Sequence, residues 1–247
     1  ILAADAALVI VGAVAVHVCV NTLNEYLDFR SGLDARTRRT PFSGGSGTLQ
    51  ARPELAGWTL ALSFASLLAA AAIGLRFAAT RGSWILAPGL AGIALAVTYT
   101  PLLLRHPLAC LLAPGLGFGP CTVLGTQLAV SGRITPAGVA VSLVPFFQVA
   151  NVLLLNQFPD VEADSVVGRR SFPVVIGRAA SARIFVAFAA AAYVAIGASV
   201  AAGWLPPACL VGLATLPLSV PACRGAVIHA GKPEALGPSL ALNAVVS

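Results

Sequence analysis

Two short stretches of the chain hold most of its acidic side chains. Six of the nine carboxylates fall within residues 25–34 and 160–164: Glu25, Asp28, Asp34, Asp160, Glu162 and Asp164. Oxygen ligands of this kind suit Mg²⁺, which proteins bind through one or two carboxylates together with the phosphates of a substrate. The two stretches therefore predict a Mg²⁺ site that takes a phosphorylated substrate.

The spacing inside each stretch places its polar side chains on one helical face. Asn24 and Asp28 are four residues apart, and so are Asp160 and Asp164. Residues at this spacing lie one above the other on a helix. Asn21 extends the first face by a further turn. We therefore expect two oxygen-rich helix faces that meet across the molecule.

Further polar residues complete this pattern. Asn156 lies four residues before Asp160, although Pro159 argues against an unbroken helix between them. Neighbouring loops supply guanidinium groups suited to phosphate oxygens: Arg105, Arg169 and Arg170. Acidic residues at helix ends are often only solvated and paired with local arginines, but two such clusters with matching asparagines favour a functional site.

The composition shows which elements must position these residues. The 247 residues are 58% hydrophobic and 10% charged, whereas a soluble domain carries about 25% charged residues. The mean hydropathy is +0.90. Seven apolar runs are long enough for transmembrane helices, with a partial run from about residue 238: 3–27, 57–79, 84–103, 109–130, 136–158, 183–202 and 207–226. The fold class is therefore all-α, a multi-pass transmembrane helical bundle.

The arginines orient this bundle in the membrane. If the loops alternate between two sides, one side receives 12 of the 15 basic residues and both acidic clusters. By the positive-inside rule that side is the cytoplasm, so we expect a multi-pass protein of the cell membrane with its active site facing the cytoplasm. Since the chain begins at Ile1 and lacks methionine, we expect residues 1–247 to form one integral-membrane domain truncated at both ends.

Four stretches of the chain resemble the UbiA superfamily of intramembrane prenyltransferases, in particular the branch that prenylates 1,4-dihydroxy-2-naphthoate for menaquinone synthesis. They are NTLNEYLDFRSGLD (21–34), YTPLLLR (99–105), GLGFGPCTVLGT (115–126) and LLNQFPDVEADSVVGRRSFPVVIG (154–177). The resemblance implies nine helices around a cavity open to lipid, of which this chain has helices two to eight and the start of nine. It also implies Mg²⁺ as cofactor and a prenyl diphosphate, an aromatic acceptor and membrane lipid as partners, with no nucleic acid.

The resemblance also assigns roles. It places catalysis on Asp28, Asp160 and Tyr99, and it gives Mg²⁺ five carboxylate ligands: Glu25, Asp28, Asp34, Asp160 and Asp164. It places substrate binding on Asn24 and Arg105, to which the helical spacing adds Asn21 and Asn156 and the loop charge adds Arg169. Two departures from the family pattern are Glu25, where many relatives have Asp, and the absence after Arg105 of the RGLGE sequence usual in the menaquinone branch. The reaction implied is Mg²⁺-dependent prenyl transfer through an allylic carbocation.

Other readings of the sequence stay open. The acceptor could instead be homogentisate, 4-hydroxybenzoate or a glycerol phosphate lipid. Residues 28–36 only superficially resemble the motif of CDP-alcohol phosphotransferases, because their spacing differs. A polytopic secondary transporter is a non-enzymatic alternative, but its carboxylates should lie mid-span. The Gly- and Ser-rich residues 40–48 lack the P-loop pattern and predict a mobile loop that caps the cavity.

Overall fold

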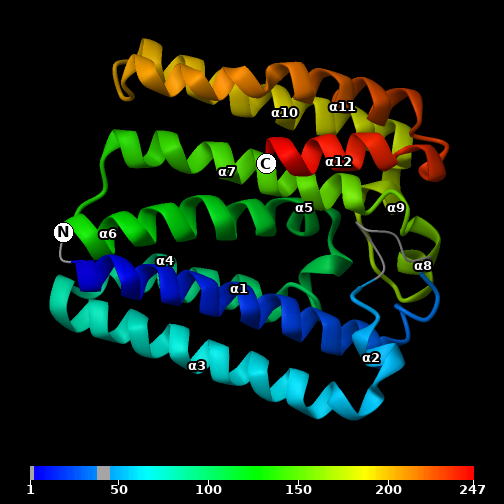
Figure 1. Ribbon diagram of the computed structural model, residues 1–247, viewed down its shortest axis with the longest axis horizontal. Helices are drawn as coiled ribbons and strands as arrows, with labels where there is room; N and C mark the ends of the chain where they lie inside the picture. The colour runs from blue at the N-terminus through cyan, green and yellow to red at the C-terminus, as the bar shows by residue number, and fades with distance from the viewer. Residues whose placement is uncertain (1–2, 38–44) are drawn as a thin grey trace.

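The computed structural model describes residues 3–37 and 45–247. Its long helices run side by side along the longest axis of the molecule (Figure 1). The α-helices are α1 (Ala3–Ser31), α2 (Thr48–Ala51), α3 (Ala56–Arg81), α4 (Leu86–Thr98), α5 (Pro107–Leu116), α6 (Gly125–Ser131), α7 (Pro136–Asn156), α8 (Val161–Val166), α9 (Phe172–Ile176), α10 (Arg178–Ala201), α11 (Leu216–Ile228) and α12 (Gly237–Val246). Shorter or irregular helical segments join them: η1 (Pro53–Leu55), η2 (Ser83–Ile85), η3 (Leu103–Arg105), η4 (Gly117–Leu124), η5 (Pro207–Thr215) and η6 (Pro233–Ala235).

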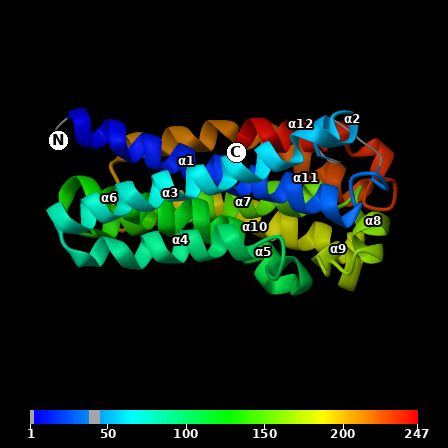
Figure 2. The same cartoon turned by 90° about the horizontal axis from the view of Figure 1, so that it is seen from below.

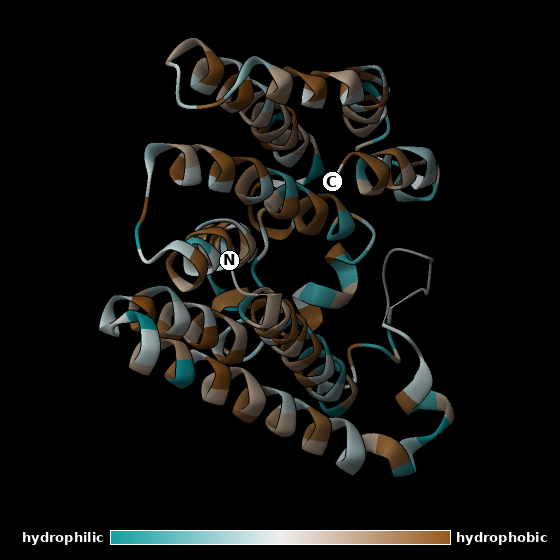
Figure 3. Ribbon diagram, turned by 60° about the vertical axis from the view of Figure 1, so that its left-hand side comes forward, coloured by the Kyte–Doolittle hydropathy of each residue, from teal (hydrophilic) through white to brown (hydrophobic). Residues whose placement is uncertain are grey.

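Six helices in the described part of the chain are long and apolar enough to cross a membrane: Ala3–Ser31, Pro53–Arg81, Pro107–Ser131, Pro136–Asn156, Arg178–Ala201 and Pro207–Ile228. Hydrophobic and pale colours dominate these helices (Figure 3). The expected all-α membrane bundle is thus confirmed. The expected span 84–103 is shorter than predicted, because the apolar helix Ser83–Thr98 ends before Pro101. A proline disfavours helical geometry in the residue before it.

Successive long helices alternate in direction, so the loops after α1, α4, α7 and α11 lie at one end of the bundle. The short helices α2, α8 and α9 gather at this end in both views (Figures 1 and 2). At the other end, the buried carboxylate of Asp5 pairs with Arg81 at 2.5 Å and with Arg76 at 3.8 Å. Two of the three basic residues expected on that side therefore share one acid.

Two glycines bring α5 and η4 close to α7. A Cβ atom on Gly115 would lie 2.4 Å from the carbonyl oxygen of Phe146, and one on Gly119 would lie 2.5 Å from that of Ser142. Small residues four positions apart allow this approach of helix backbones in membranes. The same span has prolines at 114 and 120, and the chain forms the π-helical segment η4 around the second of them. This close packing sets the position of α7.

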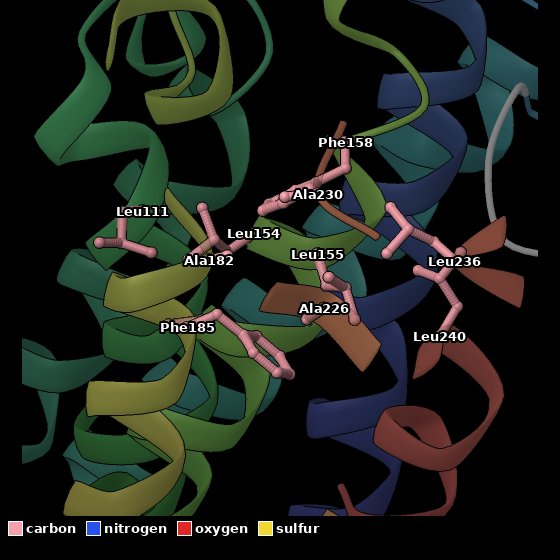
Figure 4. Close-up of a cluster of buried hydrophobic side chains, with 11 residues drawn as sticks. Leu111, Leu154, Leu155, Phe158, Ala182, Phe185, Ala226, Ala230, Leu236 and Leu240 are labelled. Carbon is pink, nitrogen blue, oxygen red and sulfur yellow. The ribbon is translucent and has the colours of Figure 1, made fainter. Parts of the chain in front are cut away.

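A buried apolar cluster fixes the end of α7 that leads to the second acidic stretch. Leu154, Leu155 and Phe158 belong to one buried cluster together with Phe185 of α10 and Leu236 (Figure 4). The exposure of Leu155 and of Phe158 is 0%. The chain therefore enters residues 159–164 from a rigidly packed position.

Candidate active site

A cavity of about 190 Å³ lies at the end of the bundle where α2, α8 and α9 gather. Residues of both acidic stretches line it, although three candidate membrane spans and the shorter apolar helix Ser83–Thr98 lie between them in the sequence. The polar residues in its wall include Asn24, Glu25, Asp28, Asp34, Asn156, Gln157, Asp160, Asp164, Arg169 and Ser171. The structure thus places the two predicted clusters around one space.

The last turns of α1 supply the first cluster. Asn24 and Asp28 lie on one face, and the side-chain amide of Asn24 donates a hydrogen bond of 2.9 Å to the hydroxyl of Thr100. Gly32, with φ +70°, ends the helix, and the backbone N–H of Leu33 then donates to the carbonyl of Asp28. A glycine in this conformation commonly reverses the chain after a helix. The chain therefore reverses at Gly32, four residues after Asp28, and then leads to Asp34.

The segment after the undescribed residues 38–44 borders the first cluster. The backbone N–H and hydroxyl of Ser46 donate hydrogen bonds of 3.2 and 2.6 Å to the carboxylate of Glu25. Gly45 lies so close to Asp34 that a Cβ atom would be 2.9 Å from a carboxylate oxygen. The side-chain amide of Gln50 donates to Asp34 at 2.9 Å. Of the predicted capping loop 40–48, residues 40–44 lie outside the described residues.

The turn after α7 and the short helix α8 supply the second cluster. Helix α7 ends at Asn156, before Pro159, so the helix is interrupted as the sequence suggested. The backbone N–H of Asp164 then donates to the carbonyl of Asp160 at 2.8 Å. Both carboxylates line the cavity, and only 3% of Asp164 is exposed.

Arg169 joins the two clusters. Its guanidinium forms ion pairs with Asp28 of the first cluster and, at 3.4 Å, with Asp164 of the second. A backbone hydrogen bond of 2.9 Å from Arg169 to the carbonyl of Asp164 holds it in place. Burial raises the pKa of Asp164, and the charge of Arg169 opposes that shift. One cation therefore offsets part of the cost of burying two carboxylates.

Tyr99 lines the cavity at the end of α4. Burial, which is the main cause, raises the pKa of its hydroxyl well above the ordinary value. The phenol is therefore neutral at physiological pH. Its neighbour Cys110 accepts a hydrogen bond of 3.2 Å from the side-chain amide of Gln157.

Two predicted site residues do not line the cavity. The exposed Asn21 donates its side-chain amide to the carbonyl of His17 at 2.7 Å, so the helix itself satisfies this group. Arg105 is exposed because the tight turn η3 faces Leu104 into the cavity and the next side chain outward. Neither prediction of substrate contact gains support from its position.

Sequence reasoning missed four polar residues in the wall: Thr37, Cys110, Gln157 and Ser171. Only 1% of Ser171 is exposed, and its hydroxyl has no hydrogen-bond partner among residues 3–37 and 45–247. Its place two residues after Arg169 was a usable signal, because alternate residues of an extended segment face the same way. A buried hydroxyl without a partner is costly unless a ligand completes it.

The fold and the cavity together define an integral membrane protein with a strongly acidic site at one end of an apolar helical bundle. The chain belongs to the UbiA prenyltransferase family, whose family model matches residues 3–228. It is therefore a prenyltransferase.

Two curated proteins show what the chain resembles. It is 28% identical over 215 residues to the 1,4-dihydroxy-2-naphthoate octaprenyltransferase of Bacillus subtilis (strain 168), covering 86% of this chain and 68% of that protein. It is 29% identical over 210 residues to the 1,4-dihydroxy-2-naphthoate octaprenyltransferase of Mycobacterium tuberculosis (strain ATCC 25618 / H37Rv), covering 84% and 69%. No solved structure matches the chain.

Proposed function

We propose that this protein transfers an isoprenyl group from an allylic prenyl diphosphate to an aromatic quinone precursor such as 1,4-dihydroxy-2-naphthoate, in a Mg²⁺-dependent reaction. The observation that carries the proposal is the single cavity that both acidic clusters line. The names of the two curated relatives support the acceptor, and family membership supports the donor.

The charges around the cavity fit Mg²⁺. Five carboxylates but only one guanidinium line it among the described residues, so a diphosphate alone would meet a repulsive wall. No group of three acidic, histidine or cysteine side chains within the described residues forms a ready-made metal cage. This arrangement suits Mg²⁺, since the oxygens of the diphosphate complete its coordination. Glu25, Asp28, Asp34, Asp160 and Asp164 would hold it.

When bound, Mg²⁺ would stabilise the negative charge that develops on the leaving diphosphate. The guanidinium of Arg169 and the hydroxyl of Ser171 would donate hydrogen bonds to the diphosphate oxygens. Breaking the allylic carbon–oxygen bond gives a carbocation, which the neutral ring of Tyr99 can stabilise through its π face. An electron-rich carbon of the acceptor attacks this cation, and the ring then loses a proton to restore aromaticity.

We also propose that the cavity faces the cytoplasm of the cell. The loops at its end carry most of the arginines. At the other end Asp5 pairs with Arg76 and Arg81, which reduces the positive charge there. Both features agree with the positive-inside rule.

The test uses the full-length protein in lipid nanodiscs with a labelled prenyl diphosphate, Mg²⁺ and a panel of aromatic acceptors. We expect Asp28→Asn and Asp160→Asn each to lower the turnover by at least ~100-fold, since loss of metal-binding groups typically has such effects. Glu234→Gln is the matched control, because this exposed carboxylate lies outside the cavity. Turnover by the two aspartate variants within threefold of this control would refute the proposal.

A further inference from the structure

Arg178, the first residue of α10, makes three hydrogen bonds behind the second acidic cluster. Its Nε donates to the carbonyl oxygen of Phe158 at 2.7 Å, and its Nη2 donates to both carboxylate oxygens of Glu162 at 2.8 Å. The side chain of Arg178 is 18% exposed, and it does not line the cavity.

The two residues that Arg178 contacts flank Asp160. Phe158 lies two residues before it, and Glu162 lies two residues after it and two before Asp164. In helical geometry a residue two positions away points to nearly the opposite face. Accordingly, the Glu162 side chain is 73% exposed, whereas that of Asp164 is 5% exposed. Arg178 therefore binds the outer face of the segment whose inner face carries the cavity carboxylates.

This segment needs an external support. Helix α8 has six residues, which is too few for a stable isolated helix, and Pro159 interrupts the chain before it. Arg178 itself is anchored, because α10 packs through Phe185 and Ala182 into the same buried cluster as Phe158. Gly177, with φ +83°, turns the chain directly before Arg178. One guanidinium thus connects this short segment to a long helix that is packed into the core.

We propose that Arg178 is a positioning residue for prenyl diphosphate binding. It holds Asp160 and Asp164 toward the cavity through its bonds to Phe158 and Glu162, and this role rests on the function proposed above. An arginine is required because its planar fork donates to the carbonyl and the carboxylate together. A lysine has a single ammonium and reaches one of the two partners.

The test compares Arg178→Gln and Arg178→Lys with Arg183→Gln. Arg183 is the matched control, since it is an exposed arginine on the same helix and lies outside the cavity. We expect Arg178→Gln to raise the KM for the prenyl diphosphate by ~10-fold or more, in the range usual for groups that orient metal ligands. Arg178→Lys should give a smaller rise, and the KM for the acceptor should change less than twofold in both variants.

Hydrogen exchange of residues 157–166 gives a measurement that is independent of catalysis. Exchange in this segment should be faster in Arg178→Gln than in Arg183→Gln, with exchange in α7 unchanged. If Arg178→Gln matches the control in donor KM, or if its donor and acceptor KM rise equally, the positioning role is wrong. If Arg178→Gln does not fold, the same comparisons made on Arg178→Lys decide the question.

One reference variant separates this proposal from the proposed function. If Asp160→Asn abolishes turnover while Arg178→Gln behaves as the control, the positioning role fails and the proposed function stands. If Asp160→Asn is as active as the wild type, the proposed function fails and the positioning role fails with it.

Discussion

Replacing Arg169 by glutamine should destabilise the ligand-free protein. The change removes the cation between the side chains of Asp28 and Asp164, which are 11% and 5% exposed. Removing one partner of a buried ion pair typically costs 3–5 kcal/mol. We expect about 3 kcal/mol, because the adjoining cavity of about 190 Å³ lets water reach the carboxylates. At roughly 2–4 °C per kcal/mol, the Tm should fall by about 6–12 °C.

The assay is thermal unfolding of the full-length protein in detergent or nanodiscs at neutral pH with a chelator present. Arg183→Gln, which loses the same charge at an exposed site, is the control. Adding Mg²⁺ should restore part of the Tm of Arg169→Gln, because a bound cation replaces the missing positive charge. The gain on adding Mg²⁺ should be larger for Arg169→Gln than for the wild type, in which the guanidinium already occupies the carboxylates.

Two results would refute this reasoning. A Tm for Arg169→Gln within 2 °C of the control would mean that Arg169 does not offset buried charge. An equal Mg²⁺ response in the wild type and in Arg169→Gln would mean that the metal and the guanidinium do not share ligands.

Two further predictions concern the bundle. Gly115→Ala should cost about 1–3 kcal/mol of stability, because its Cβ would lie 2.4 Å from a backbone oxygen of α7. In Gly117→Ala the added Cβ meets nothing within 4 Å, so this control variant should keep the wild-type stability. Thermal unfolding of both variants checks the prediction. Arg81→Ala should cost about 1–2 kcal/mol, because among the described residues it leaves the buried Asp5 paired with Arg76 at 3.8 Å alone. This is less than for a fully buried pair, since Arg81 is 36% exposed. Its donor KM should equal that of the wild type, since the pair lies at the far end of the bundle; a raised donor KM would contradict the structure.

The sequence predicted the large-scale arrangement because membrane crossing is a simple constraint. Apolar runs give the spans, and their alternation brings Asp28 and Asp160 to one end without any knowledge of packing. The early end of the span 84–103 was also readable, since Pro101 stands near its close.

The fine arrangement was not predictable in the same way. In the three-residue turn Leu103–Arg105, Leu104 faces the cavity and Arg105 faces outward. A turn this short has no repeating pattern of apolar residues from which the direction of each side chain could be predicted. Arg169 lies between two acids because Arg170 donates its N–H to the carbonyl of Leu104 at 2.8 Å, which joins two loops far apart in the sequence. Ser171 is buried for the same reason. These positions depend on tertiary contacts between loops.

The division of the cavity between α1 and the segment after α7 has a consequence for biosynthesis. The chain is synthesised from α1 onward, so Asp160 follows Asp28 only after α3, α4, α5, α6 and α7 have been made. Asp28 is therefore synthesised well before the guanidinium that pairs with it in the folded protein. Arg169 follows Asp164 by five residues, so the second half of the site is synthesised together with the cation that pairs with both acidic clusters.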